Sequence, residues 1–300
     1  MTRPPAGLLL LDKPVGLSSN AALQRVRWLG GGIKAGHCGS LDPLASGMLP
    51  ICLGEATRLA GELLVGRKAY RFVLQLGERT ATGDAEGDVI ERCAVPALDT
   101  DSVNAALARF LGAQSQVPPM YSALKREGTP LYRLARAGIS VPREARDITI
   151  ETLELRAIEP ERLDLRVLCS KGTYVRVLGE EIAAALGSCG HLVSLRREYV
   201  EPFAEECMVT LEQLEAAGGH WPLLHADRAV AHLSPLRLGA ADALALRCGK
   251  IVALAVAGSQ PPPEGRWRLY DEEGGFLGLG VSSSAGELRV QRLFSAPLPV

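Results

Sequence analysis

Residues 36–50, GHCGSLDPLASGMLP, restrict the possible folds of this chain more than any other segment. Three glycines and two prolines interrupt the run, so it cannot continue the helical patterns on either side and we predict a loop between two helices. Asp42 is the only acidic residue between Asp12 and Glu55. Rigid loops on a scaffold often carry catalytic groups, which makes Asp42 a candidate nucleophile or base. An Asp-Pro pair that opens a turn is the alternative, and composition favours it.

Further short motifs are distributed along the chain. They are residues 11–16 (LDKPVG), 53–58 (LGEATR), 68–72 (KAYRF), 82–87 (TGDAEG), 116–125 (QVPPMYSALK), 171–176 (KGTYVR) and 195–197 (LRR). Together with residues 33–59, these blocks resemble the TruB family of tRNA pseudouridine synthases, in the family's order and over most of the chain. The visible departure is Cys38, where the family usually carries Thr.

The resemblance implies catalytic roles for three residues. Asp42 stands where the family has its catalytic aspartate, which either adds to the uracil ring or the ribose or takes a ribose proton. Arg176 would pair with that carboxylate and counter the rise in its pKa that desolvation causes. Tyr70 would stack on the target base and pass a proton at C5. By pattern alone, Tyr70 is an ordinary core residue and Arg176 an ordinary surface residue.

The resemblance also implies a set of substrate contacts. His37 would lie against the RNA where the flipped base was, and Tyr174 would form a pocket wall. A metal site at His37 and Cys38 is disfavoured, because adjacent ligands lack a third partner. The turn-like composition of residues 82–87 argues against an acid pair of Asp84 and Glu86. The other predicted RNA contacts are Leu192, Lys13, Arg196 and Arg197. For Lys13, the alternative is a supporting role under the active-site loop. For Arg196 and Arg197, structural ion pairs are an equally open alternative.

Positive charge for RNA must be found locally, because the formal net charge is only −1. Residues 119–146 supply it, with six basic and two acidic side chains. The basic residues are Lys125, Arg126, Arg133, Arg136, Arg143 and Arg146. Tyr121 and Tyr132 lie in the same stretch and are candidates for stacking on bases. A solvated helix face is the alternative.

Bulk composition indicates a cytoplasmic protein without a signal peptide. The chain has 300 residues, 47% of them hydrophobic, which suffices for one large domain or two unequal ones. No apolar run approaches the ~18 residues that span a membrane. The seven cysteines are odd in number and form no Cys-x-x-Cys, so we predict reduced thiols rather than disulfides or a zinc site. The predicted chemistry needs neither a metal nor another cofactor.

Apolar periodicity predicts mixed α and β structure. The resemblance implies an α+β pseudouridine synthase fold, with a mixed, mainly antiparallel sheet and flanking helices. We expect a catalytic domain over residues 1–233, with a basic RNA-binding insertion at about 119–146. Residues 234–300 are expected to form a small β-rich domain that resembles the PUA type. Predicted helices cover residues 18–29, 55–64, 101–111 and 176–186. Predicted strands cover residues 7–11, 70–76, 148–158, 163–169, 191–200, 267–270, 276–281 and 288–293.

The resemblance predicts an isomerase that converts uridine 55 in the T-loop of tRNA to pseudouridine, acting as a monomer without a guide RNA. One alternative is a guide-dependent relative that modifies ribosomal RNA. Another is a non-catalytic chaperone that helps tRNA fold. A hydrolase in which Asp42 and His37 activate water is the remaining enzyme class, whereas a serine hydrolase is disfavoured because no Gly-x-Ser-x-Gly elbow occurs.

Overall fold

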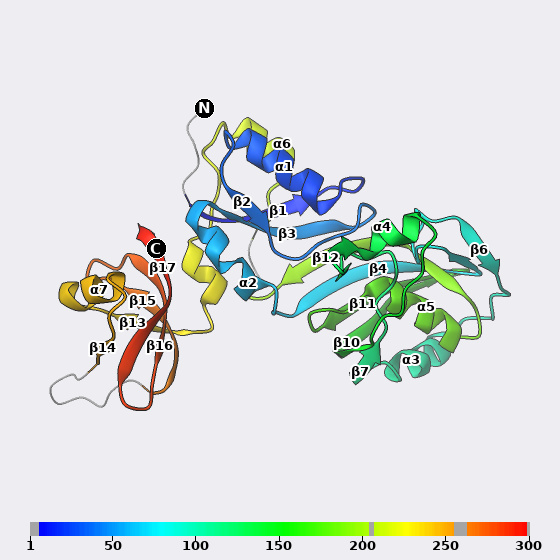
Figure 1. The fold of residues 1–300 in the computed structure, drawn as a ribbon. Helices are drawn as coiled ribbons and strands as arrows, with labels where there is room; N and C mark the ends of the chain where they lie inside the picture. The colour runs from blue at the N-terminus through cyan, green and yellow to red at the C-terminus, as the bar shows by residue number, and fades with distance from the viewer. Residues whose placement is uncertain (1–5, 204–206, 255–262, 299–300) are drawn as a thin grey trace.

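The two main β-sheets of the described residues lie in separate parts of the molecule (Figure 1). The computed structural model describes residues 6–203, 207–254 and 263–298. A large sheet occupies the N-terminal part and a smaller one the C-terminal part. Within the described residues, no helix has the length and apolar character needed to cross a membrane.

The large sheet has eight strands, in the order β1-β3-β12-β4-β11-β10-β7, with β2 also paired to β3. All its pairings are antiparallel except that of β12 with β3. This confirms the predicted fold class and the pairing of β10 with β11. Its strands are β1 (Gly7–Lys13), β2 (Ala35–His37), β3 (Ser46–Leu53), β4 (Lys68–Leu76), β7 (Gly112–Gln116), β10 (Arg146–Glu159), β11 (Arg162–Cys169) and β12 (Gly190–Val200).

Strand β1 shows how one sheet serves two cores. Successive side chains of a strand point to opposite faces, and all four leucines at 8–11 are buried. Leu9 and Leu11 enter a core that helices line, while Leu8 and Leu10 enter a second core. That second core includes Phe276 and Phe294 of the C-terminal sheet. The sheet is therefore covered on both faces at its β1–β3 end.

Helices cover one face of the large sheet, with α3 and α5 on β10, β12 and β4 (Figure 1). Ser18 caps α1 by accepting from the amide of Ala21. Asp99 caps α3 through a capping box with Ser102. The predicted helix at residues 55–64 is mostly a 3₁₀ turn. The elements are α1 (Ser19–Leu29), η1 (Gly54–Leu59), α2 (Ala60–Leu63), α3 (Thr100–Ala108), α4 (Leu131–Arg136), α5 (Val175–Ala185), α6 (Leu211–Ala216) and η2 (Ala226–Val230).

The predicted loop at residues 36–50 is only partly a loop. Residues 35–37 form β2 and residues 46–53 form β3, so the irregular part is confined to residues 38–45. The prediction was wrong for residues 46–50, because Gly47 and Pro50 lie inside β3. Pro50 lies just past the last β2–β3 pair, His37 with Ile51, a strand-end position of the kind at which a proline is tolerated in a sheet.

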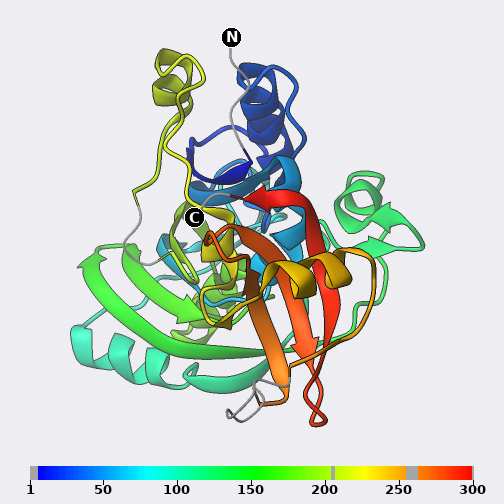
Figure 2. The same ribbon diagram turned by 90° about the vertical axis from the view of Figure 1, so that its left-hand side faces the viewer.

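The C-terminal sheet has five strands in the order β13-β15-β16-β17-β14, and α7 packs on β14 and β17. Figure 2 shows this sheet from its own side, with α7 in front. It is fastened to the rest by an ion pair of Arg266 with Glu62, 2.7 Å, and by the Arg58 guanidinium, which donates to the carbonyl of Leu293. Its elements are β13 (Ser234–Arg237), α7 (Ala240–Arg247), β14 (Val252–Ala253), β15 (Gly265–Tyr270), β16 (Phe276–Ser282) and β17 (Glu287–Leu298).

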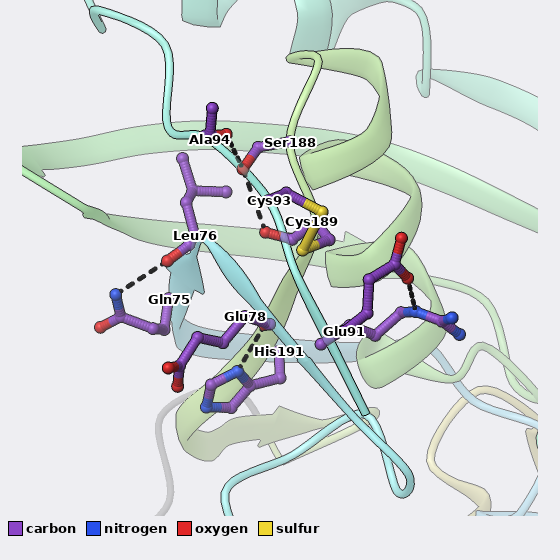
Figure 3. The surroundings of a disulfide bond; sticks show 10 residues. Gln75, Leu76, Glu78, Glu91, Cys93, Ala94, Ser188, Cys189 and His191 are labelled. Carbon is purple, nitrogen blue, oxygen red and sulfur yellow. Dashed lines mark hydrogen bonds and ion pairs between the residues drawn. A yellow bond between two sulfur atoms is a disulfide. The ribbon is translucent and has the colours of Figure 1, made fainter. Parts of the chain in front are cut away.

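The prediction that all cysteines are reduced thiols was wrong for one pair. Cys93 and Cys189 form a disulfide across a sequence separation of 96 residues (Figure 3). Such a pairing cannot be read from spacing, because the fold alone brings the two residues together. The remaining cysteines are free, and three of them, Cys38, Cys52 and Cys169, are buried.

Candidate active site

The centre of the site is an ion pair between Asp42 and Arg176. Arg176 lies in the first turn of α5, and its Nε donates to Oδ2 of Asp42 over 2.9 Å. Only 5% of the Arg176 side chain is exposed, against 40% for Asp42. The arginine is thus fixed inside the protein, while the carboxylate it holds keeps a free face.

Three more protein groups fix the Arg176 guanidinium. Its NH1 donates to the carbonyl of Thr82 and its NH2 to that of Tyr121, over 2.6 Å. Asp84, which is buried, places Oδ2 3.6 Å from Nε. Residues 82–87 do form the predicted turn, in which Thr82 Oγ1 and the Glu86 amide donate to Asp84. The contact of Asp84 with Arg176 was missed, since nothing in a turn motif signals a distant partner.

A cavity of about 340 Å³ opens at the free face of Asp42. Tyr70, Tyr174 and Arg176 line it, so the structure brings together the residues predicted to act on one base. Sequence analysis missed Lys68 as a wall residue, whose Nζ donates to the carbonyls of Leu64 and Gly66. The other lining residues are Gly39, Ser40, Leu41, Leu64, Ser122, Ala123, Leu124, Lys171, Gly172, Thr173, Val175, Leu195 and Arg197.

Burial shifts the proton affinities of these groups. Desolvation raises the pKa of Asp42 above its ordinary value; Arg176 opposes that rise and the nearby Asp84 adds to it. Burial also raises the pKa of Tyr70, which Arg197 partly offsets, and the pKa of Tyr174. Both tyrosines therefore keep their protons at neutral pH. The pKa of Lys68 falls to about 8, chiefly because its ammonium is buried.

Two buried cations lie near Asp42, and one of them, Arg197, donates to the loop that carries it. Arg197 is 1% exposed and donates to the carbonyls of Met48, 2.7 Å, and Gly39, 3.1 Å. Lys13 is fully buried and donates to the carbonyls of Pro14 and Leu17. The prediction that Arg197 and Lys13 are RNA contacts is corrected, because their donors are used inside the protein. The alternative supporting role of Lys13 matches its position.

Ser19 and Gly47 fix the two ends of the same loop. Ser19 Oγ accepts from the amide of Leu41 and donates to its carbonyl, at 2.7 and 3.0 Å. Gly47 has φ of +97°, and a Cβ there would lie 2.2 Å from the carbonyl oxygen of Arg197. Only glycine therefore permits the parallel contact of β3 with β12 beside the site.

The remaining predicted contacts are scattered. Leu192 is fully buried against Gly179, so its prediction as an RNA contact is corrected to a core residue. Arg196 forms a bidentate ion pair with Asp12, at 2.8 and 3.0 Å. His37 is half-buried at the end of β2 and does not line the cavity. Burial lowers the pKa of His37, so the ring is neutral, and its Nδ1 has no partner.

The basic insertion stands largely in solvent. Lys125 and Arg126 lie in β8 (Lys125–Arg126), which pairs with β9 (Thr129–Pro130), and Arg133 and Arg136 lie in α4. These four side chains and Arg146 are exposed, whereas Arg143 is half-buried and its Nε has no partner. Arg143 lines a second cavity, of about 390 Å³, on the side of Arg176 away from Asp42. Among the described residues, no group of three or more His, Cys, Asp or Glu side chains could hold a metal ion.

Comparison with known proteins shows the family of the chain. Residues 27–175 match the model of the TruB family pseudouridylate synthase N-terminal domain, and residues 176–237 and 234–294 match two models of TruB C-terminal regions. The tRNA pseudouridine synthase B of Ectopseudomonas mendocina is 47% identical over 96% of this chain and 94% of its own length. That of Pseudomonas putida is 48% identical over 96% and 95%.

Solved structures share the fold. An H/ACA RNP bound to a substrate RNA containing 2′-deoxyuridine contains a chain that aligns with a TM-score of 0.73 and 22% identity, over 97% of this chain and 85% of that one. A Cbf5-Nop10-Gar1 complex aligns with a TM-score of 0.70 and 24% identity, over 98% and 83%. The sequence matches extend over nearly the whole chain at high identity. The chain therefore belongs to the TruB family of pseudouridylate synthases.

Proposed function

We propose that this protein is a tRNA pseudouridine synthase that isomerises uridine 55 in the T-loop. The observation that carries the proposal is the Asp42 carboxylate, held by a buried Arg176 at the edge of a cavity lined by two tyrosines. The relatives that match over the whole chain are tRNA pseudouridine synthases B. The reaction breaks the N-glycosidic bond and rejoins the ribose through C5, which makes the enzyme an isomerase of the intramolecular-transferase class.

Asp42 starts the reaction in this proposal. Ionised and facing the cavity, it serves as a nucleophile toward the ring or the ribose, or as a base toward a ribose proton. Arg176 keeps the carboxylate ionised in a site that excludes water. Tyr70 keeps its proton at neutral pH, since burial raises its pKa. It is therefore able to stack on the base and to pass a proton when C5 exchanges hydrogen for carbon.

A base in a folded T-loop must leave its stack to reach Asp42, which costs a few kcal/mol. We assign His37 to the RNA surface, because its neutral ring lies on β2, directly before the loop that carries Asp42. The exposed cations of the insertion, Lys125, Arg126, Arg133, Arg136 and Arg146, fit contacts with tRNA phosphates. Residues 1–233 would then form the catalytic domain and residues 234–300 a PUA-like RNA-binding domain. We further assign the protein to the cytoplasm, as a monomer without a guide RNA.

Tritium release from a tRNA transcript labelled with [5-³H]uridine tests the proposal. The intact protein should release tritium, because C5 loses its hydrogen when the new bond forms. Release should vanish with Asp42→Asn and with a transcript in which cytidine replaces uridine 55. Release that persists with the altered transcript would contradict the target. No release from the intact protein would favour a guide-dependent enzyme or a non-catalytic chaperone.

A further inference from the structure

The disulfide Cys93–Cys189 lies at the base of a hairpin that leads to the active site. Strands β5 (Glu78–Thr80) and β6 (Val89–Arg92) form this hairpin. At its base, the Cys93 amide donates to the carbonyl of Gly77, and the Gly77 amide donates to the carbonyl of Cys189. The two Cα atoms are 5.7 Å apart, a usual spacing for a disulfide. The sulfur bridge thus joins the last residue of the hairpin to the residue before β12 (Figure 3).

Strand β12 follows the hairpin from this base to its tip. Nδ1 of His191 donates to the carbonyl of Glu78 over 2.8 Å, and Figure 3 shows the ring beneath the disulfide. Further along, the Leu192 amide donates to Gly83 and the Leu192 carbonyl accepts from Ala85. The hairpin tip is therefore located by contacts that begin at Cys189.

The tip holds Arg176. The Thr82 carbonyl accepts from its NH1, and the Asp84 carboxylate lies 3.6 Å from its Nε. Arg176 lies in the first turn of α5, and the chain that follows this helix passes through Ser188 to Cys189. These links form a closed loop of contacts: the disulfide joins the hairpin base to Cys189, the hairpin tip contacts Arg176, and helix α5 connects Arg176 back toward Cys189. Opening the bridge would leave the tip held by hydrogen bonds and by the Asp84–Arg176 ion pair, without a covalent link at its base.

We propose that Cys93 and Cys189 form a redox-responsive clasp that positions Arg176 against Asp42. The clasp makes the rate of the isomerisation depend on thiol redox state, so this inference rests on the proposed function. Because Arg176 opposes the rise in the pKa of Asp42, a looser hold would also leave the carboxylate protonated at higher pH.

The exchange partner is a low-molecular-weight disulfide or thiol. On oxidation, one cysteine thiolate attacks the small disulfide and expels a small thiolate, and the second cysteine then attacks the mixed disulfide and expels another. Two protein thiols are oxidised, the small disulfide is reduced to two thiols, and the two cysteine protons end on them. On reduction a small thiolate attacks Cys93, the less buried of the two residues, and expels the Cys189 thiolate. A second small thiolate attacks the mixed disulfide and expels the Cys93 thiolate, so two small thiols become one small disulfide and their protons end on the two cysteines.

The test uses the full chain with Cys207→Ser and Cys248→Ser, which removes the two exposed free thiols. Protein equilibrated in oxidised or reduced glutathione is assayed by single-turnover tritium release at several pH values, and by hydrogen exchange of residues 78–92. The matched variant adds Cys93→Ser and Cys189→Ser. Alkylation and mass spectrometry confirm the state of the pair in each sample.

Reduction should lower the rate by about 5-fold, the low end of couplings between two sites. It should also move the acid limb of the pH profile upward and speed amide exchange at the hairpin tip. The serine variant should match the reduced protein under both conditions. The proposal would be overturned if the oxidised and reduced proteins had equal rates, equal acid limbs and equal amide exchange. It would also be overturned if the serine variant responded to redox state as strongly as the protein with both cysteines. If no sample releases tritium, the proposed function fails, and hydrogen exchange alone still decides whether the pair clasps the hairpin.

Discussion

The active-site loop and the basic insertion are built in opposite ways. Residues 38–45 are held by the buried side chains of Arg197 and Ser19, which donate to the carbonyls of Gly39 and Leu41. Buried Lys13 holds the preceding turn, whose Gly16 amide donates to the carbonyl of Pro43. Residues 119–146 carry most of their cations into solvent, and their β8–β9 pair is two residues long. The first region is therefore fixed by buried donors, whereas the second presents its cations to solvent.

The difference separates chemistry from recognition. A carboxylate that must meet one atom of a base works only if its geometry is set in advance. Cations that contact a phosphate backbone need only be charged and exposed, because each contact adds to the binding affinity without precise placement. Substitutions in the loop should therefore change kcat or stability, whereas substitutions in the insertion should change KM and its salt dependence.

The largest effect is expected for Arg176→Ala. Removing the cation leaves Asp42 desolvated beside Asp84, so the pKa of Asp42 rises further. We expect single-turnover tritium release at neutral pH to fall by about 10³-fold, comparable to the loss of one preorganised charge contact. The acid limb of the pH–rate profile should shift to higher pH, because activity requires the ionised carboxylate.

The control for Arg176→Ala is Arg176→Lys, which keeps the charge but loses the fork that reaches Thr82 and Tyr121. The acid limb of its pH–rate profile should lie at lower pH than that of the alanine variant. If both variants share one limb with the intact protein, the charge of Arg176 does not set the ionisation of Asp42.

Among the side chains that hold the loop from neighbouring elements, Arg197 in β12 should give the largest loss of stability when it is replaced by alanine. The substitution strands the carbonyls of Met48 and Gly39 inside the protein, and the free energy of unfolding should fall by about 3 kcal/mol. Urea unfolding measures this. The adjacent Arg196→Ala is the matched control: its side chain is 41% exposed, and its loss should cost about 1 kcal/mol or less. Equal losses would mean that burial of Arg197 contributes nothing to holding the loop.

A smaller effect of opposite sign is expected for Asp84→Asn. The negative charge of Asp84 raises the pKa of Asp42, so neutralising it should lower that pKa and shift the acid limb to lower pH. The turn should survive, because the amide oxygen can still accept from Thr82 and Glu86. The pH–rate profile of the variant checks the direction. An upward shift would show that Asp84 acts by orienting Arg176 rather than through its charge.

Sequence reasoning recovered the parts of this molecule that local patterns encode. Alternation and helical periodicity predicted α1, β4 and β11, since their buried faces repeat at a regular spacing. Motif resemblance brought Asp42, Tyr70 and Arg176 together, and one cavity contains all three.

What sequence reasoning missed depends on residues that are distant in the chain. Asp84 meets Arg176, and Cys93 meets Cys189, only after the sheet has formed. Leu192 and Arg197 were predicted as RNA contacts, with a structural role also open for Arg197, yet both side chains are buried. No local pattern distinguishes a buried arginine that supports a loop from an exposed one that binds phosphate.

The smallest expected effect tests the other half of the comparison. Lys125→Gln with Arg133→Gln removes two exposed cations of the insertion. KM for tRNA should rise several-fold while kcat stays unchanged, and the slope of log KM against log salt should fall by about 1 for each lost phosphate contact. Arg162→Gln, at the exposed start of β11, removes one cation outside the insertion; it is the single-charge control for Arg133→Gln alone and should leave both quantities unaltered. A loss of kcat in the double variant would mean that the insertion shapes the catalytic cavity, and the separation of recognition from chemistry would not hold.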